Sequence, residues 1–260
     1  MSNLNSLSFS KRMGILNKEK QSNIILAIDP LYNTHNPFNH IVTLITELGK
    51  FLCAIKLNFH VILPFSFTEI QKINDIAHDE KLQVIADIKL NDIPDTNKIA
   101  IQYLYSMGFD SIIVNPFMGK NNLKITTDFA HSLGCGIISL IYMSHDDAHE
   151  GFGASIINSA EHGSSNRSNL FYKVFYQNSK ESNVDGIVIG GNRLDILKEF
   201  SIKKELPIYS PGLITQGGNI KSALNYGADF LIIGRAILNS NDPLSELKGI
   251  HNIIKGSTFK

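Results

Sequence analysis

The sequence lacks the features that mark strongly charged or membrane-spanning proteins. Its 260 residues carry 24 basic and 24 acidic side chains, so no net charge would attract nucleic acid or an acidic membrane. No apolar run approaches the ~18 residues that a membrane span needs, and residues 1–20 have no hydrophobic segment typical of a secretory signal. Any anion that the protein binds must therefore be held by a local site.

Cysteine is also scarce. Cys53 and Cys135 each lie in an apolar run and have no metal-like spacing, so we expect buried, reduced thiols and a cytoplasmic protein. Glycine and proline are not in excess, which argues against disordered and fibrous classes. The chain is long enough to bury a sizeable core.

Short apolar runs rich in Ile, Val and Leu recur along the chain. Most do not alternate with polar residues, which is typical of parallel strands covered on both faces. The stretches between them have helical spacing. Eight such units fit a (β/α)8 barrel better than a doubly wound sheet, which would need fewer strands. The runs are 24–28, 52–57, 82–86, 111–114, 136–141, 186–189, 207–209 and 230–233.

We predict a single barrel domain over residues 1–260, with its core at 23–242 and an N-terminal extension at 1–22. Leu4, Leu7, Met13, Ile15 and Leu16 favour a helix in this extension that packs on the barrel, and a frayed tail is the alternative.

Residues 144–167 form a long polar segment after the fifth predicted strand. A loop of this length and place predicts a functional role or a polar lid at the C-terminal face of the barrel. His145 and His149 lack the Glu of a His-Glu-x-x-His helix, so we predict no metal site there.

Charged residues cluster after the third predicted strand. Asp87 ends that strand, Lys89 follows two positions later and so points the same way, and Asp92 lies in the next loop. Such charges are costly unless they pair. Carboxylates beside an ammonium favour its charged form, which can act as a general acid. A salt-bridge network that only closes the barrel top is the alternative.

Two glycine-bearing turns follow the last two predicted strands. Residues 210–218 include Gln216, and Gly234-Arg235 follows strand eight. Barrels often bind phosphate at these loops through backbone N–H groups, and an arginine adds a two-pronged donor. Glycines used only for turns are the alternative. Asp29 and Lys56, at the ends of strands one and two, could bind sugar hydroxyls.

The segment from Asp87 to Thr96, D-I-K-L-N-D-I-P-D-T, resembles the signature D-x-K-x-x-D-I-x-x-T of the orotidine 5′-phosphate decarboxylase family. The resemblance runs from about residue 23 to 242 and includes five further motifs. They are Leu26-Ala27-Ile28-Asp29, Ala54-Ile55-Lys56, Met143-Ser144-His145, Ser210-Pro211-Gly212 with Gln216-Gly217-Gly218, and Ile233-Gly234-Arg235.

The resemblance implies decarboxylation of orotidine 5′-phosphate (OMP) to UMP in pyrimidine biosynthesis, without metal or organic cofactor. Lys89 would protonate C6, with Asp87 and Asp92 beside the scissile carboxylate. In a homodimer, Asp92 and Thr96 would complete the partner's pocket. The other implied substrate-binding residues are Asp29 and Lys56 for the ribose, Ser144 for the base, Gln216, Gly234 and Arg235 for the phosphate, and Ile93, Pro211, Gly212 and Gly217.

The sequence departs from the family at two places. Asn115-Pro116-Phe117 replaces a histidine-containing segment, and Asp146-Asp147 replaces the usual Pro-Gly after His145. The polar segment that follows is also longer than is typical of the family.

Three other functions are compatible with a charged barrel mouth. Mg²⁺-dependent relatives that act on sugar phosphates resemble D-x-K-T-x-D, whereas Leu90 follows Lys89 here. A non-catalytic nucleotide sensor would have no use for the full charged set. A Schiff-base aldolase needs a neutral lysine, which the neighbouring carboxylates oppose.

Overall fold

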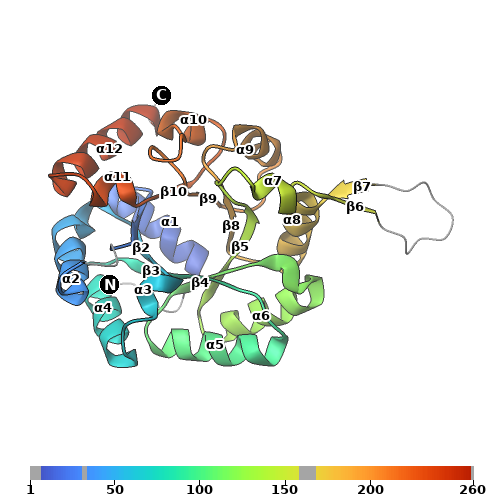
Figure 1. Cartoon of the computed structure of the whole chain (residues 1–260), viewed down its shortest axis with the longest axis horizontal. Helices are drawn as coiled ribbons and strands as arrows, with labels where there is room; N and C mark the ends of the chain where they lie inside the picture. The colour runs from blue at the N-terminus through green and yellow to red at the C-terminus, as the bar shows by residue number, and fades with distance from the viewer. Residues whose placement is uncertain (1–6, 31–33, 158–167, 259–260) are drawn as a thin grey trace.

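Eight parallel strands close into a barrel in the computed structural model, which describes residues 7–30, 34–157 and 168–258 (Figure 1). The (β/α)8 prediction is confirmed. Around the barrel the strands follow chain order, and the last pairs with the first. They are β1 (Ile24–Ile28), β2 (Ala54–Asn58), β3 (Gln83–Leu90), β4 (Ser111–Val114), β5 (Gly136–Tyr142), β8 (Gly186–Ile189), β9 (Ile208–Ser210) and β10 (Phe230–Ile233).

Helices surround the barrel and cover the outer face of the strands (Figure 1). None in the described ranges is long and apolar enough to cross a membrane. They are α2 (Pro37–Leu48), η2 (Gly49–Phe51), α3 (Phe59–Ile62), α4 (Phe67–Asp79), α5 (Pro94–Ser106), η3 (Pro116–Met118), α6 (Lys120–Ser132), α8 (Phe171–Glu181), α9 (Leu194–Ser201), α10 (Ile220–Asn225), α11 (Arg235–Leu238) and α12 (Pro243–Thr258).

The apolar runs become strands because both of their faces are covered. Every residue of β1, β4, β5, β8 and β10 is buried, between the barrel interior and the helices. The helices bury one stripe each, as in α2, where Ile41, Leu44, Ile45 and Leu48 face the barrel. This packing brings the carboxyl ends of all eight strands to one face.

Helix α1 (Phe9–Lys20) precedes β1 and closes the opposite face, as the sequence predicted for the extension. Phe9 packs so tightly over Gly136 that a Cβ there would lie 2.6 Å from the Phe9 side chain. The buried Arg12 donates to Gln83 and pairs with Asp110 at 3.3 Å. Residues 1–6, part of the predicted extension, lie outside the described residues.

The polar segment after β5 is more ordered than the predicted loop. It contains the short helix α7 (Ala148–Gly151) and an antiparallel pair, β6 (Ser155–Ile157) with β7 (Ser168–Leu170). His149 therefore lies in a helix, contrary to prediction, and its Nδ1 contacts the Asp146 carbonyl at 2.8 Å. Residues 158–167 lie outside the described part of the chain.

Aromatic rings anchor the base of this segment. Phe117, which stands in one of the departures from the family, packs at 4.7 Å from Phe175 and 5.3 Å from Phe171, measured between ring centroids. Phe152 adds a third ring at 6.3 Å. Edge-to-face packing of this kind stabilises a cluster beyond the area it buries, so Phe117 has a structural role at the start of the loop after β4.

Two histidines beside α1 are hydrogen-bonded to carboxylates. His131 Nε2 lies 2.8 Å from Asp185 Oδ2, and His78 Nε2 lies 2.9 Å from Asp110 Oδ2. The bond to Asp185 raises the pKa of His131 despite partial burial. Burial lowers the pKa of His78, but the bond to Asp110 outweighs it and leaves the pKa raised.

We therefore expect the melting temperature to fall as pH rises from about 6 to about 9. A histidine whose pKa is raised by folding stabilises fully below its unfolded value of about 6.5 and loses that contribution above its folded value. The His78→Gln/His131→Gln double variant should lose part of this slope, as scanning calorimetry at several pH values would measure. An unchanged slope would show that these pairs do not set the pH dependence.

Candidate active site

A cavity of about 290 Å³ opens where the carboxyl ends of the strands meet. Its floor and walls include the apolar side chains of Ile113, Leu140, Val188 and Ile232. Ten of the predicted site residues line it, namely Asp29, Lys56, Asp87, Lys89, Ser144, Pro211, Gly212, Gln216, Gly234 and Arg235. The structure thus brings together residues that are up to about 200 positions apart in the sequence.

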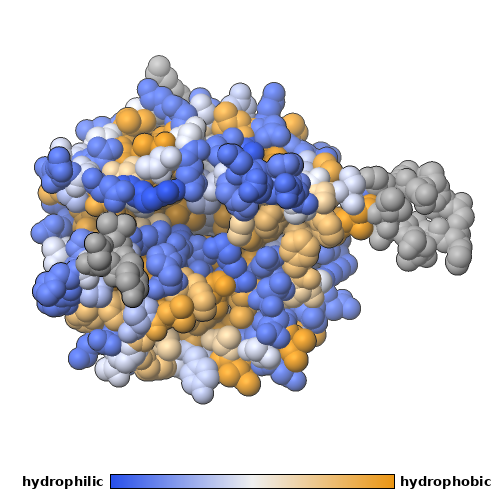
Figure 2. Space-filling view, viewed as in Figure 1, coloured by the Kyte–Doolittle hydropathy of each residue, from blue (hydrophilic) through white to orange (hydrophobic). Residues whose placement is uncertain are grey.

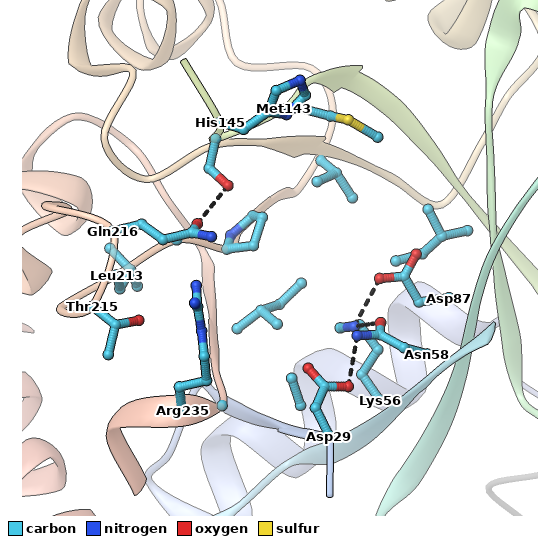
Figure 3. A pocket seen from close by; sticks show the side chains of 18 of the residues that line it. Asp29, Lys56, Asn58, Asp87, Met143, His145, Leu213, Thr215, Gln216 and Arg235 are labelled. Atoms are coloured by element: carbon cyan, nitrogen blue, oxygen red, sulfur yellow. Dashed lines mark hydrogen bonds and ion pairs between the residues drawn. The ribbon is translucent and has the colours of Figure 1, made fainter. Parts of the chain in front are cut away.

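One side of the cavity carries a cluster of alternating charge, of which Asp87 and Lys56 are labelled on the right of Figure 3. Asp87 lies between two lysines, with Lys56 Nζ 2.7 Å from Oδ2 and Lys89 Nζ 2.8 Å from Oδ1. Lys56 and Asp87 are 4% and 9% exposed, so these groups interact where water screens them little. The cluster holds the Lys89 ammonium group at the cavity wall.

The two ammonium groups keep Asp87 ionised. Burial raises the pKa of this carboxyl, but the charges of Lys56 and Lys89 and their hydrogen bonds outweigh burial, so its pKa is held below the ordinary value. Asp87 therefore presents a negative charge to any ligand in the cavity at neutral pH.

Asn58 links this cluster to β1. Its Oδ1 accepts a hydrogen bond from Lys56 Nζ, and its Nδ2 donates to Asp29 Oδ1 at 2.6 Å. Sequence reasoning missed Asn58, although its place two residues after Lys56 on β2 puts both side chains on one face.

The backbone of β3 is irregular at Lys89. The predicted strand ended at Asp87, whereas β3 continues to Leu90 and its pairing with β4 shifts register between Ala86 and Leu90. Lys89 has a φ of 48°, which is uncommon for a residue other than glycine. Such backbone strain often marks functional sites, and here it accompanies the contact between Lys89 and Asp87.

The opposite side of the cavity carries the positive charge of Arg235. Arg235 lines it and forms no ion pair within the described part of the chain, and Figure 3 shows its side chain extending toward Gln216. Gly212 has a φ of 81°, which favours glycine. A Cβ at Gly234 would lie 2.9 Å from the Ala27 carbonyl oxygen, so only glycine lets this loop approach β1.

Ser144 connects the loop after β5 to the loop after β9. Its Oγ donates to Gln216 Oε1 at 2.7 Å, across the mouth of the cavity (Figure 3). Sequence reasoning assigned these two residues to different parts of a ligand and did not predict their contact.

Four predicted site residues do not line the cavity of one chain: Asp92, Ile93, Thr96 and Gly217. Asp92 is exposed, and its Oδ1 accepts a hydrogen bond from the Ile93 N–H at 2.7 Å. Within one chain Asp92 therefore does not join Lys89, and the pairs that form are Lys56–Asp87 and Lys89–Asp87. A role for Asp92 in a neighbouring subunit stays a prediction.

The described residues contain no group of three or more His, Cys, Asp and Glu side chains arranged to hold a metal ion. Among the charged side chains that line the cavity, Lys56, Lys89 and Arg235 face the carboxylates of Asp29 and Asp87. This excess of positive charge suits a ligand with more than one anionic group.

The barrel and its site define a class: parallel (β/α)8 barrels with a charged cluster on the early strands and an arginine beside glycine-bearing turns after the last two strands. Comparison with known proteins is more specific. Residues 22–250 match the model of the "Orotidine 5′-phosphate decarboxylase / HUMPS family". The chain belongs to this family, which confirms the resemblance found in the sequence.

Individual relatives agree with the match. The chain is 31% identical over 231 residues to orotidine 5′-phosphate decarboxylase of Methanocaldococcus jannaschii, covering 86% of this chain and 95% of that protein. The chain is 29% identical over 235 residues to the Pyrococcus abyssi enzyme, and the match covers 90% of this chain and 99% of that protein. A crystal structure of the M. jannaschii enzyme complexed with the inhibitor BMP has a TM-score of 0.75 at 27% identity, covering 90% and 98% of the chains.

Proposed function

We propose that this protein is an orotidine 5′-phosphate decarboxylase, which converts OMP to UMP and CO₂ in pyrimidine biosynthesis. The observation that carries the proposal is the division of one cavity into two charged ends. The Lys56–Asp87–Lys89 cluster lies on one side, and the guanidinium of Arg235 lies on the other. A nucleotide with a carboxylated base and a 5′-phosphate has matching groups at its two ends.

In this proposal the 5′-phosphate binds at Arg235, Gln216 and Gly234. The guanidinium can donate two parallel hydrogen bonds, and the glycine lets the backbone come close. The ribose hydroxyls bind at Asp29 and Lys56, which Asn58 already connects. Pro211, Gly212 and Gly217 belong to the loop between β9 and α10, which we call the phosphate loop, and they set its backbone conformation.

The base then lies against the charged cluster. Ser144 contacts the polar edge of the base. The carboxylate of the substrate lies near Asp87, and the lowered pKa of Asp87 keeps that side chain ionised. Repulsion between these carboxylates is relieved as the bond from C6 to the carboxyl carbon breaks. The electron pair stays on C6, and the Lys89 ammonium group stabilises it and then donates its proton there. Lys89 recovers a proton from solvent.

The proposed reaction uses no metal and no organic cofactor, because fixed charge at Lys89 does what a cofactor would otherwise do. We place the protein in the cytosol, where its two buried cysteines would stay reduced.

A homodimer is the second part of the proposal. Large apolar side chains are exposed on α3, α4 and α5, including Phe59, Leu63, Ile99 and Tyr103, and Figure 2 shows hydrophobic residues gathered beside the cavity mouth. Ile93 is 62% exposed on the same side of the barrel, next to Asp92. Burying such a patch against a second copy would be favourable, and would bring Asp92 and Thr96 to the partner's site.

The absorbance of OMP in buffer containing EDTA tests the proposed function directly. The expected result is loss of substrate absorbance with formation of UMP at a rate that added Mg²⁺ does not change. Turnover that needs Mg²⁺ would favour the sugar-phosphate relatives, and tight binding without turnover would favour a nucleotide sensor.

We expect the Arg235→Ala variant to raise the KM for OMP by about 10- to 100-fold, because a charge-assisted hydrogen bond contributes about 1.5–3 kcal/mol. Steady-state kinetics would measure it. The nucleoside orotidine, which lacks the phosphate, is the matched control, and its slow turnover should change less than about twofold. An equal loss with both substrates would contradict a phosphate role for Arg235.

A further inference from the structure

The loop between β8 and α9, residues 190–193, lies between the two loops that Ser144 and Gln216 connect. Asn192 on this loop makes two hydrogen bonds. Its Nδ2 donates to the Ser144 carbonyl oxygen at 2.8 Å and to the Gln216 carbonyl oxygen at 3.3 Å. One side-chain amide thus holds the backbone of both loops.

Close backbone contacts fix this loop in place. The Gly190 N–H donates to the Tyr142 carbonyl at 3.0 Å, and the Gly191 N–H donates to the Pro211 carbonyl at 2.7 Å. A Cβ at Gly190 would lie 2.8 Å from Ser144 Cα. These contacts fix the backbone of residues 190 and 191 against both neighbouring loops. The side chain of Asn192 therefore projects from a fixed backbone and can hold the two neighbouring loops at a set distance from each other.

The phosphate loop depends on these contacts. Residues 214–217 are exposed, and Ile214 has a φ of 66°, which is strained for a β-branched residue. Among the described residues, Ser144 and Asn192 provide the hydrogen bonds that connect Gln216 to other loops. Without Asn192, the contact between the Ser144 and Gln216 side chains would be the remaining hydrogen bond of these two that ties Gln216 to a neighbouring loop.

The next residue, Arg193, contacts only one of the two neighbouring loops in the hydrogen bonds and ring contacts of its side chain. The Arg193 guanidinium donates to the His145 carbonyl and lies 5.6 Å from the centroid of the Tyr142 ring. Both groups belong to β5 and the loop after it. The side chain of Asn192, unlike that of Arg193, also contacts the phosphate loop, through the Gln216 carbonyl.

We propose that Asn192 is a positioning residue that locks the phosphate loop against the loop carrying Ser144. Binding energy from the phosphate is then used to place the base end of the substrate, as catalysis by remote binding requires. This inference rests on the proposed phosphate role of Gln216. It predicts that Asn192 matters for substrates with a phosphate and little for those without one.

The test compares OMP with orotidine in the wild-type chain and in the Asn192→Ala variant. Loss of two hydrogen bonds should lower kcat/KM for OMP by about 10- to 100-fold, while the value for orotidine changes less than about twofold. Asn219→Ala is the matched control. Asn219 caps α10 through its bond to the Ser222 N–H at 3.0 Å, so the control loosens a nearby element without touching Ser144 or Gln216. An equal fall with both substrates, or no fall with either, overturns the proposal.

A double-mutant cycle gives an independent measurement. If Asn192 acts through the phosphate loop, Asn192→Ala should change kcat/KM for OMP less than about twofold in a Gln216→Ala background. Fully additive losses would show that the two residues act separately and would overturn the proposal. If Asn192→Ala does not fold, the nearly isosteric Asn192→Asp removes the same donors and is used in its place.

Calorimetry of UMP and uridine extends the comparison to binding. The variant should bind UMP more weakly by about the same factor and uridine unchanged, and equal effects on the two ligands would contradict the proposal. Failure of the proposed function would be seen in the wild-type chain as absence of OMP turnover. Failure of the Asn192 inference would be seen in the variant as loss of selectivity for the phosphate.

Discussion

Replacing Lys89 with alanine is expected to lower kcat for OMP by about 10⁴-fold or more, because one group is asked both to stabilise the charge at C6 and to supply the proton. Its ammonium group is the exposed member of the cluster, with a side chain 39% accessible at the cavity wall. A substrate can therefore reach it without rearrangement of the buried Lys56.

The fold should survive this substitution. Asp87 keeps its bond to Lys56 at 2.7 Å, so no buried carboxylate is left without a partner. The melting temperature, measured by calorimetry, should therefore change little compared with the effect on kcat. This separates a catalytic loss from unfolding.

Lys124→Ala is the matched control. Lys124 pairs with Asp128 on the exposed face of α6, away from the cavity, so its removal eliminates a lysine without altering the site. The control should retain wild-type activity. A Lys89→Ala variant that keeps more than about a tenth of wild-type kcat would remove Lys89 from the proposed mechanism.

Purified mixed dimers of two inactive variants should recover about half of wild-type activity, because each mixed dimer contains one intact site and one inactive site. The pair is Lys89→Ala with Asp92→Ala. Where Asp92 completes the partner's pocket, the mixed dimer has a site with Lys89 from one chain and Asp92 from the other. The exposed position of Asp92 outside its own cavity motivates this expectation.

The experiment uses two affinity tags on chains expressed together, so that mixed dimers are purified before assay. Lys89→Ala with Asp87→Ala is the matched control, because these residues touch within one chain at 2.8 Å and cannot complement each other. Recovery in both mixtures would indicate exchange or contamination. Recovery in neither, with dimers present, would show that Asp92 does not act across an interface.

Much of the architecture followed from local pattern. Runs of Ile, Val and Leu without alternation predicted parallel strands, and four of them, 24–28, 111–114, 186–189 and 230–233, are strands with the predicted bounds. Strand β3 was predicted too short, because Asp87 and Lys89 interrupt its apolar run while its backbone pairing continues to Leu90. The charged residues Asp87 and Lys89 were taken to mark the end of the strand. They instead lie within β3, where the ion pair between them makes their charges tolerable.

The segment after β5 shows a second limit. Its polar composition predicted a loop, yet α7 and the β6–β7 pair form there. Their support comes from the packing of Phe117 on η3 against Phe171 and Phe175 on α8. Such contacts between distant residues have no local signal in the sequence.

The sequence by itself determined the fold class, the family and the residue types of the site, because strand periodicity and the spacing from Asp87 to Thr96 are local properties of the chain. Tertiary structure decided which charges meet. Asp87 is bound by Lys56 from the neighbouring strand as well as by Lys89, and Asn192 joins two loops 24 and 48 residues away. These contacts arise because barrel closure brings the ends of separate strands to one face, and no spacing along the chain records which side chains will touch there.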